Sequence, residues 1–332
     1  MRRLVQTIPF LIAATLAAMS PAIANPEFKL RFASYAPTGD IIDLATKRFK
    51  EEVEKLTNGR VEVAIFGSNS LGSNREVLEM AKVGGLDFVV AGSTHVSRYA
   101  PVLNTVSLPY LWKDRDTMLN LLDSEVGAKI TSIVASQGLK IIGWWDAGFR
   151  HVSNNRRPIL KVEDMKGLKL RTLPSPVHVS FFRAIGAIPT PMDWAEVMPA
   201  LQQGVIDGQE NSPAVMHPYR VYEFQKYYSL TGHVSEPIVV VMSGQTFAKM
   251  PKDLQDAILQ AAKEATLYER KIAGEYDIKL MGELRKVMTI NEVPEATLIE
   301  LRKIAQTVYE KAYSDFGQDG KMIIDEINKR TK

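Results

Sequence analysis

The 332-residue sequence contains no cysteine, so no disulfide bond can cross-link the fold. The same absence removes the thiolate ligands of the common zinc sites. A chain of this length buries enough apolar surface to fold without cross-links. It also usually divides into two domains.

Motifs of the common enzyme and nucleotide-binding classes are also missing. The five histidines form no H-E-x-x-H pair, and the chain has no G-x-S-x-G, G-x-G-x-x-G or G-x-x-x-x-G-K-[ST] run. The acidic stretch Asp315–Asp325 lacks the spacing of a calcium loop, so we interpret it as a solvated turn. We therefore expect no cofactor, no metal and no catalytic residue, although two carboxylates brought together by the fold remain an open alternative.

Positive and negative residues nearly balance, with 41 lysines and arginines against 38 aspartates and glutamates. The formal net charge is +3, and losing Arg2 and Arg3 with an N-terminal leader would lower it to +1. A protein that binds nucleic acid normally carries a basic patch. The expected partner is therefore a small molecule or the local surface of another protein.

The longest apolar run lies near the N-terminus, and charged residues interrupt every later run before it could span a membrane. The N-terminal run spans 8–19, follows Arg2 and Arg3, and precedes Ala22-Ile23-Ala24, the pattern of a secretory signal cleaved after Ala24. A membrane anchor is the alternative, but about a dozen apolar residues are too few to cross a bilayer, which needs about 20. The expected location of the mature chain is the periplasm, with no membrane-spanning segment of its own.

Strand and helix patterns alternate along the mature chain. Strands are indicated at 29–34, 61–66, 86–91, 139–145, 168–173 and 236–243, and helices at 41–56, 74–83, 177–185 and 193–203, where Asn74 and Asp193 are the expected caps. Alternation of this kind predicts an α/β fold with mainly parallel strand pairing. From Pro251 to Val287 an almost unbroken helical pattern would be on the order of 50 Å long, enough to lie across two domains unless Gly274 interrupts it.

Polar and aromatic residues that could hold a ligand gather between 144 and 211. Arg150 follows a buried strand, and ligands of open α/β sheets bind beyond strand ends. Arg171 lies on the face of its strand opposite two leucines, where it would either be solvated or grip a carboxylate with its planar fork. Trp194 fits either a core or the apolar wall of a ligand site, and Asn211 either a cap or a hydrogen bond to a ligand.

Six motifs follow one another along the chain: F-G-S-N-S-L-G-S-N-R-E (66–76), L-P-Y-L-W (108–112), G-L-K-L-R (167–171), I-G-A-I-P-T-P-M-D-W-A-E-V (185–197), A-L-Q-Q-G-V-I-D-G-Q-E-N (200–211) and Y-E-F-Q-K-Y-Y-S-L-T-G-H (222–233). With them the whole mature chain resembles the dicarboxylate-type solute receptors of TRAP (tripartite ATP-independent periplasmic) transporters. The resemblance implies a two-lobed periplasmic-binding-protein-like fold with a ligand cleft between the lobes and one long helix spanning both. The implied lobes are 25–148 plus about 237–276 (lobe I) and 149–236 plus about 277–332 (lobe II).

The same resemblance implies the residues that contact the ligand. Arg171 matches the arginine that forms a two-pronged salt bridge with the substrate carboxylate, and Arg150 and Asn211 match groups beside it. Trp194 matches an aromatic wall. The far end of the ligand would be read from the first lobe by Tyr35 and Asn74, with Glu76 close to them. Where other family members can carry an acid after the strand at 86–91, this chain has Gly92.

The implied function is capture of a small organic acid, of the sugar-acid or C4-dicarboxylate type, and its delivery to integral-membrane permease subunits by a monomeric receptor. One alternative is a periplasmic lyase or glycosidase using the same cleft, for which His151 and Glu76 are the nearest acid–base candidates. Another is a receptor that signals instead of transporting.

Overall fold

The computed structural model describes residues 25–331, apart from the side chains of residues 311–314 and 331. The export signal expected at 1–24 lies outside the described residues. Within the described part, no helix combines the length and apolar character needed to cross a membrane.

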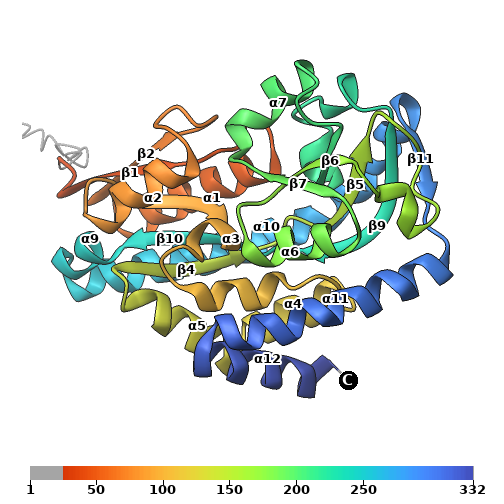
Figure 1. Cartoon of the computed structure of the whole chain (residues 1–332). Helices are drawn as coiled ribbons and strands as arrows, with labels where there is room; N and C mark the ends of the chain where they lie inside the picture. The colour runs from red at the N-terminus through yellow and green to blue at the C-terminus, as the bar shows by residue number, and fades with distance from the viewer. Residues whose placement is uncertain (1–24, 332) are drawn as a thin grey trace, which may run out of the picture.

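Two β-sheets lie side by side (Figure 1). The first has the order β2-β1-β3-β10-β4, and its strands are β1 (Phe28–Ala33), β2 (Val61–Phe66), β3 (Phe88–Gly92), β4 (Leu139–Trp145) and β10 (Ile238–Ser243). The second has the order β11-β9-β5-β8-β6-β7, and its strands are β5 (Phe149–Asn154), β6 (Lys169–Thr172), β7 (Ile188–Pro191), β8 (Gly208–Asn211), β9 (Tyr227–Ser235) and β11 (Thr289–Glu292).

The helices cover the faces of these sheets. They are α1 (Ile41–Leu56), α2 (Asn74–Lys82), α3 (Ser93–Val96), α4 (Arg115–Leu122), α5 (Glu125–Ala135), α6 (Pro176–Ala184), α7 (Trp194–Gln202), α8 (Pro213–Met216), α9 (Gly244–Lys249), α10 (Lys252–Val287), α11 (Glu295–Asp315) and α12 (Gly317–Thr331), with 3₁₀ turns η1 (Pro101–Ser107), η2 (Val162–Met165) and η3 (Val221–Glu223). The mixed α/β fold confirms the expected fold class.

The chain passes between the sheets through short connections. Residues 146–148 join β4 to β5, and Glu236 and Pro237 join β9 to β10. These crossing strands pair antiparallel with their neighbours: β10 with β3 and β4, and β5 with β8 and β9. The other pairs are parallel, as expected: β1 with β2 and β3, β9 with β11, and β6 with β7 and β8. Local periodicity did not predict the antiparallel pairs, because it does not show that a strand enters a sheet from the other half.

Helix α10 is one continuous element of 36 residues and runs behind both sheets (Figure 1). Gly274 does not interrupt it. A Cβ at this position would lie 3.0 Å from Nη1 of Arg115, whose guanidinium bonds to the carbonyl of Arg270 and to Asp146. The glycine thus gives Arg115 room to connect α10 to the crossing after β4.

The C-terminal segment is helical where a solvated turn was expected. Helix α11 ends at Asp315, Gly317 takes the left-handed backbone with φ +63°, and α12 follows directly. Ile323, Ile324 and Ile327 of α12 are buried, which accounts for the helix because acidic residues fill only its outer face.

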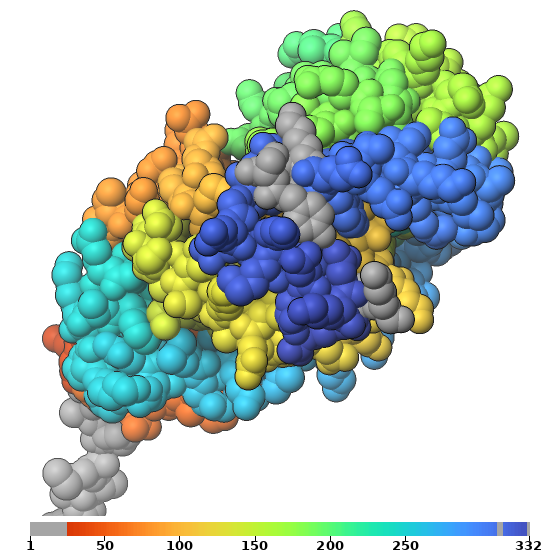
Figure 2. Space-filling model, turned by 60° about the horizontal axis from the view of Figure 1, so that its bottom comes forward, coloured from red at the N-terminus to blue at the C-terminus, as the bar shows by residue number. Residues whose placement is uncertain are grey.

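Helix α12 contacts α4, α5 and η1, and α5 packs on β4 of the first sheet. Figure 2 shows α12 lying on this face of the molecule, whereas α11 contacts α6 and η2 beside the second sheet. The C-terminal segment thus touches both halves, although the expected lobe limits placed all of 277–332 in lobe II. Those limits stay a prediction.

Candidate functional site

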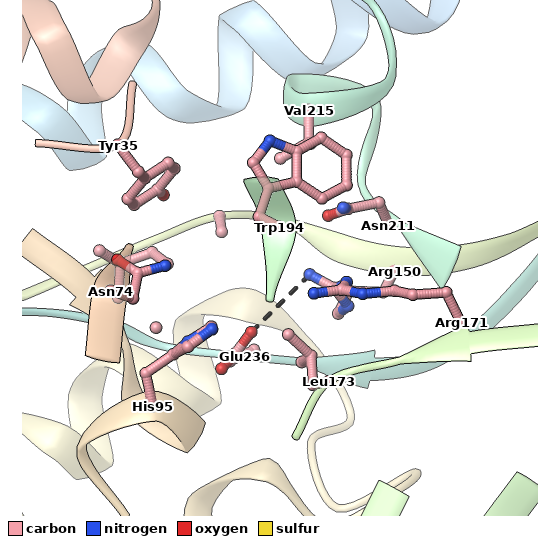
Figure 3. A pocket seen from close by; sticks show the side chains of 13 residues that line it. Tyr35, Asn74, His95, Arg150, Arg171, Leu173, Trp194, Asn211, Val215 and Glu236 are labelled. Carbon is pink, nitrogen blue, oxygen red and sulfur yellow. Dashed lines mark ion pairs between the residues drawn. The ribbon is translucent and has the colours of Figure 1, made fainter. Parts of the chain in front are cut away.

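A cavity lies where the crossing strands leave the first sheet and enter the second. It encloses about 450 Å³ of space, counting the part that is open to solvent. Figure 3 shows its side chains converging from both sheets. It is lined by Tyr35, Asn74, Gly92, His95, Ala147, Arg150, Arg171, Leu173, Trp194, Asn211, Val215, Glu236 and Ile238. Six of the seven residues expected from the sequence are in this set.

Arg171 is the charged group of the cavity that lacks a counter-ion. Its Nε and Nη2 donate to the carbonyl of Met192 at 3.1 and 2.9 Å, and its guanidinium carbon lies 5.6 Å from the ring centre of Trp194. Nη1 is buried without a hydrogen-bond partner, and within residues 25–331 no carboxylate forms an ion pair with the group. Arg171 is only 1% exposed, so of the two orientations left open by the sequence, the buried one is observed, while Lys169 is exposed.

Burial, together with the nearby Arg150 and against the effect of Glu210, lowers the pKa of Arg171 to about 10. The guanidinium therefore stays protonated at neutral pH. An isolated buried cation is costly because it has lost its water. An anion placed against Nη1 would recover that cost.

Arg150, by contrast, already has a partner. Its Nε and Nη2 donate to the Glu210 carboxylate at 2.6 and 2.9 Å, and Nη2 also donates to the Glu210 carbonyl at 2.6 Å. Burial opposes the charge, but the Glu210 carboxylate outweighs it and raises the pKa of Arg150. Burial likewise opposes ionisation of Glu210, yet Arg150 and His233 hold its pKa far below the usual range. This buried ion pair positions Arg150 from one side and leaves its Nη1 facing the cavity.

Asn211 and Trp194 complete the half of the cavity that the second sheet supplies. Asn211 lines the cavity, and its side-chain oxygen accepts a hydrogen bond from the Ser212 amide at 3.2 Å. Ser212, not Asn211, is the cap residue of α8. Trp194 begins α7 after the N-cap Asp193, and its ring packs edge-on against Tyr219 with centroids 5.0 Å apart. Trp194 therefore serves both as core and as cavity wall.

Tyr35, two residues after β1, and Asn74, the first residue of α2, line the cavity, whereas Glu76 does not reach it. Ser73, and not the expected Asn74, caps α2, and the Glu76 carboxylate closes the capping box by accepting from the Ser73 amide at 2.8 Å. This bond turns Glu76 into solvent and, by fixing the first turn of the helix, leaves Asn74 buried and facing the cavity. Burial raises the pKa of Tyr35 well above its usual value, so its phenol is neutral.

Glu236 and His95 also line the cavity, and the sequence reasoning missed both as ligand contacts. Each had a signal: His95 follows the buried strand β3, and Glu236 is the single charge before an otherwise apolar strand. Burial, reinforced by Arg171, lowers the pKa of His95 to about 4, so its imidazole is neutral at neutral pH. His151, one of the two acid–base candidates for an enzyme, is not among the lining residues; its Nδ1 accepts from the Gly232 amide at 2.8 Å.

Known proteins resemble this chain over nearly its whole length. Residues 32–315 match the bacterial extracellular solute-binding proteins, family 7. The 2,3-diketo-L-gulonate-binding periplasmic protein YiaO of Escherichia coli is 32% identical, over 83% of this chain and 84% of its own.

Two solved structures share both fold and sequence with this chain at 30% identity. A TRAP periplasmic solute-binding protein of Sulfurospirillum deleyianum, with bound succinate, has a TM-score of 0.86 over 91% of this chain and 99% of its own. Another from Roseobacter denitrificans, with bound L-galactonate, has a TM-score of 0.85 over 92% of this chain and 100% of its own. The expected resemblance is thereby confirmed: this chain belongs to family 7 of the bacterial extracellular solute-binding proteins, the receptors of TRAP transporters.

Proposed function

We propose that the cavity holds the carboxylate of a small organic acid, and that the buried, unpaired edge of Arg171 is the group that binds it. Arg171 carries the proposal because its Nη1 has no partner while its other donors are fixed on the Met192 carbonyl. The Nη1 edge of Arg150, which lies 3.7 Å from Glu236, and the Asn211 amide lie beside the same carboxylate. Trp194 supplies the apolar wall, and Tyr35 and Asn74 face the part of the bound acid that lies beyond its carboxylate.

The relatives support this class of ligand. L-galactonate, succinate and 2,3-diketo-L-gulonate each carry a carboxylate, and they are bound by proteins of the same fold and family. The receptor encloses the acid as its lobes close and releases it unchanged to integral-membrane permease subunits. It acts as a monomer in the periplasm, after cleavage of the leader behind Ala24.

A thermal-shift screen identifies the acid, because a ligand that binds only the folded protein raises the melting temperature. The screen covers aldonates, uronates, dicarboxylates and keto acids. Recovery of the chemically unchanged acid after long incubation supports a receptor, and its conversion would favour the lyase or glycosidase alternative.

The carboxylate assignment is tested by Arg171→Ala. Removing one partner of a desolvated ion pair costs about 3–5 kcal/mol, so we expect the affinity for the identified acid to fall several hundredfold or more by calorimetry. Arg183→Ala is the matched control, because Arg183 is an exposed arginine on α6 of the same half. A loss below tenfold in Arg171→Ala would refute the assignment.

A further inference from the structure

The cavity contains a fixed carboxylate of its own. Glu236 is 2% exposed and lies in the two-residue connection between β9 and β10. Its Oε1 accepts from the Thr94 amide at 3.1 Å and also from the Thr94 hydroxyl, and its Oε2 lies 3.7 Å from Nη1 of Arg150. Figure 3 shows it between the arginines and the end formed by Tyr35, Asn74 and His95.

Gly92 leaves the space that the Glu236 carboxylate occupies. A Cβ at position 92 would lie 2.5 Å from Oε1 of Glu236, closer than two such atoms can approach. Because Gly92 at the end of β3 has no side chain, the carboxylate of Glu236, which comes from the connection between β9 and β10, can occupy that space. Glu236 is thus held on one side by Thr94 and bounded on another by the backbone of Gly92, and it cannot retreat from a ligand without breaking these contacts.

The charges around the cavity leave a place for one anion. Arg150 is balanced by Glu210, and Glu236 lies close to the remaining edge of Arg150. Of the two arginines that line the cavity, only Arg171 has no carboxylate partner in the part of the chain that the structure describes. The other lining residues include no lysine or further arginine. A second ligand carboxylate would therefore be desolvated without a cation and would face Glu236, which is unfavourable on both counts.

The far end is instead suited to hydroxyl groups. Both ring nitrogens of His95 are buried without a hydrogen-bond partner, and Nε2 is 3.9 Å from Asp193. A neutral imidazole has one donor and one acceptor, whereas the carboxylate of Glu236 can only accept. A hydroxyl, which both donates and accepts, satisfies each of them. The amide of Asn74 and the phenol of Tyr35 add further donors and acceptors at this end.

We propose that the ligand is a polyhydroxylated monocarboxylate, such as an aldonate, and that Glu236 both binds its hydroxyls and excludes dicarboxylates. This inference rests on the proposed function, since it takes the single carboxylate to lie on Arg171. It narrows the ligand from organic acids in general to those with one charged end.

The experiment compares acids that differ only in the second carboxylate. Calorimetry on the mature wild-type protein uses aldonates of about four to six carbons and the aldarates of the same length and configuration, for example erythronate with meso-tartrate and galactonate with galactarate. We expect at least one aldonate to bind about 100-fold more tightly than its aldarate. The inference is overturned if the aldarate that matches the tightest-binding aldonate binds within tenfold of it, or more tightly.

Glu236→Gln tests the residue itself, because it keeps the size of the side chain and removes its charge. We expect the preference for aldonate over aldarate to shrink by about tenfold or more. Glu51→Gln is the control, since Glu51 is exposed on α1 and lies outside the cavity, and should leave the preference unchanged. An unaltered preference in a folded Glu236→Gln protein would contradict the role of Glu236, and the wild-type comparison stands even if that variant does not fold.

The same titrations separate this inference from the proposed function. If Arg171→Ala abolishes binding while the wild type holds aldarates as tightly as aldonates, the carboxylate site stands and the inference about Glu236 fails. If Arg171→Ala binds the aldonate as the wild type does, or if no acid binds the wild type, the proposed function fails and this inference fails with it.

Discussion

Two buried arginines lie in one cavity and have opposite surroundings. Arg150 forms a two-pronged pair with Glu210, whereas Arg171 has only a carbonyl and the face of Trp194. A paired buried charge stabilises the local fold as a unit, and an unpaired one creates affinity for an anion. The partners, more than the arginines themselves, therefore make Arg171 the group that we propose as the main contact of the ligand carboxylate.

Removing the charge of Glu210 should destabilise the protein. In Glu210→Gln the buried guanidinium of Arg150 loses its two-pronged partner and keeps only the Glu236 carboxylate, 3.7 Å away; breaking such a buried pair typically costs about 3–5 kcal/mol of unfolding free energy. Urea denaturation measures the loss. The control is Glu223→Gln, which breaks the exposed pair with Arg220 and should leave the denaturation midpoint unchanged. Equal midpoints for both variants would show that the Arg150–Glu210 pair adds nothing to stability.

The sequence predicted much of the site but not its pairing. Arg171, Asn211 and Trp194 were found because they lie in motifs, and Arg150 because it follows a buried strand. The alternation of β6 puts Arg171 on one face of its strand. The partner of Arg150 lies 60 residues further along the chain, and local patterns do not identify such a partner. Glu236 was missed because the strand pattern absorbed it as a first residue, although the chain is in fact crossing between sheets there.

At the scale of elements, periodicity located most boundaries. The expected helix at 41–56 and strand at 61–66 coincide with α1 and β2, because apolar spacing and flanking polar residues agree there. The cap of α2 was misplaced by one residue, since Ser73 and Asn74 are both good caps and only the capping box with Glu76 selects the first. Helix α12 was missed because its acidic residues hid the buried isoleucines.

The N-terminus of α1 makes stability depend on pH. Asp40, the N-cap, is buried; its burial, with Asp43 nearby, raises its pKa to about 7, against a hydrogen bond from the Ile42 amide. Between about pH 4 and 7 the folded protein therefore keeps a proton on Asp40 that the unfolded chain has released. The contribution of Asp40 to the free energy of unfolding falls as the pH rises through that window and does not change further above pH 7.

Asp40→Asn should remove this dependence and keep the cap, because asparagine is an equally good N-cap residue. We expect the melting temperature of the variant, relative to the wild type, to be several degrees more favourable at pH 8 than at pH 5. Scanning calorimetry at the two values measures the difference. A relative melting temperature that does not change with pH would show that Asp40 is ionised in the folded protein already at pH 5.

At the scale of the molecule, a hydrogen bond joins the two halves beside Trp194. The Tyr219 hydroxyl donates to the carbonyl of Tyr35 at 2.8 Å, and the ring of Tyr219 packs on Trp194. Tyr219 belongs to the apolar cluster of the second half, and Tyr35 packs against that of the first. This contact therefore spans the cavity from the side of the aromatic wall and forms only when the halves are close.

Tyr219→Phe removes that hydrogen bond and keeps the ring. One net hydrogen bond is worth about 0.5–1.5 kcal/mol, so we expect affinity for the identified acid to fall about 2- to 12-fold while the melting temperature of the ligand-free protein stays the same. Tyr276→Phe is the control, because its hydroxyl lies 3.5 Å from the Gly39 carbonyl and is exposed. Equal affinities for wild type and Tyr219→Phe would show that the contact does not contribute to closure.

Glu236 lies in one of the two short connections between the halves, and Arg150 lies two residues after the other. In the receptor that we propose, the groups that contact the ligand and the connections that must bend as the halves close are therefore the same few residues. A substitution that changes which acid is read will also change how fast the cleft reopens, so residence time and selectivity cannot be adjusted independently. In a receptor built in this way, a substitution at position 236 that changes the preferred acid will also change the rate at which that acid is released.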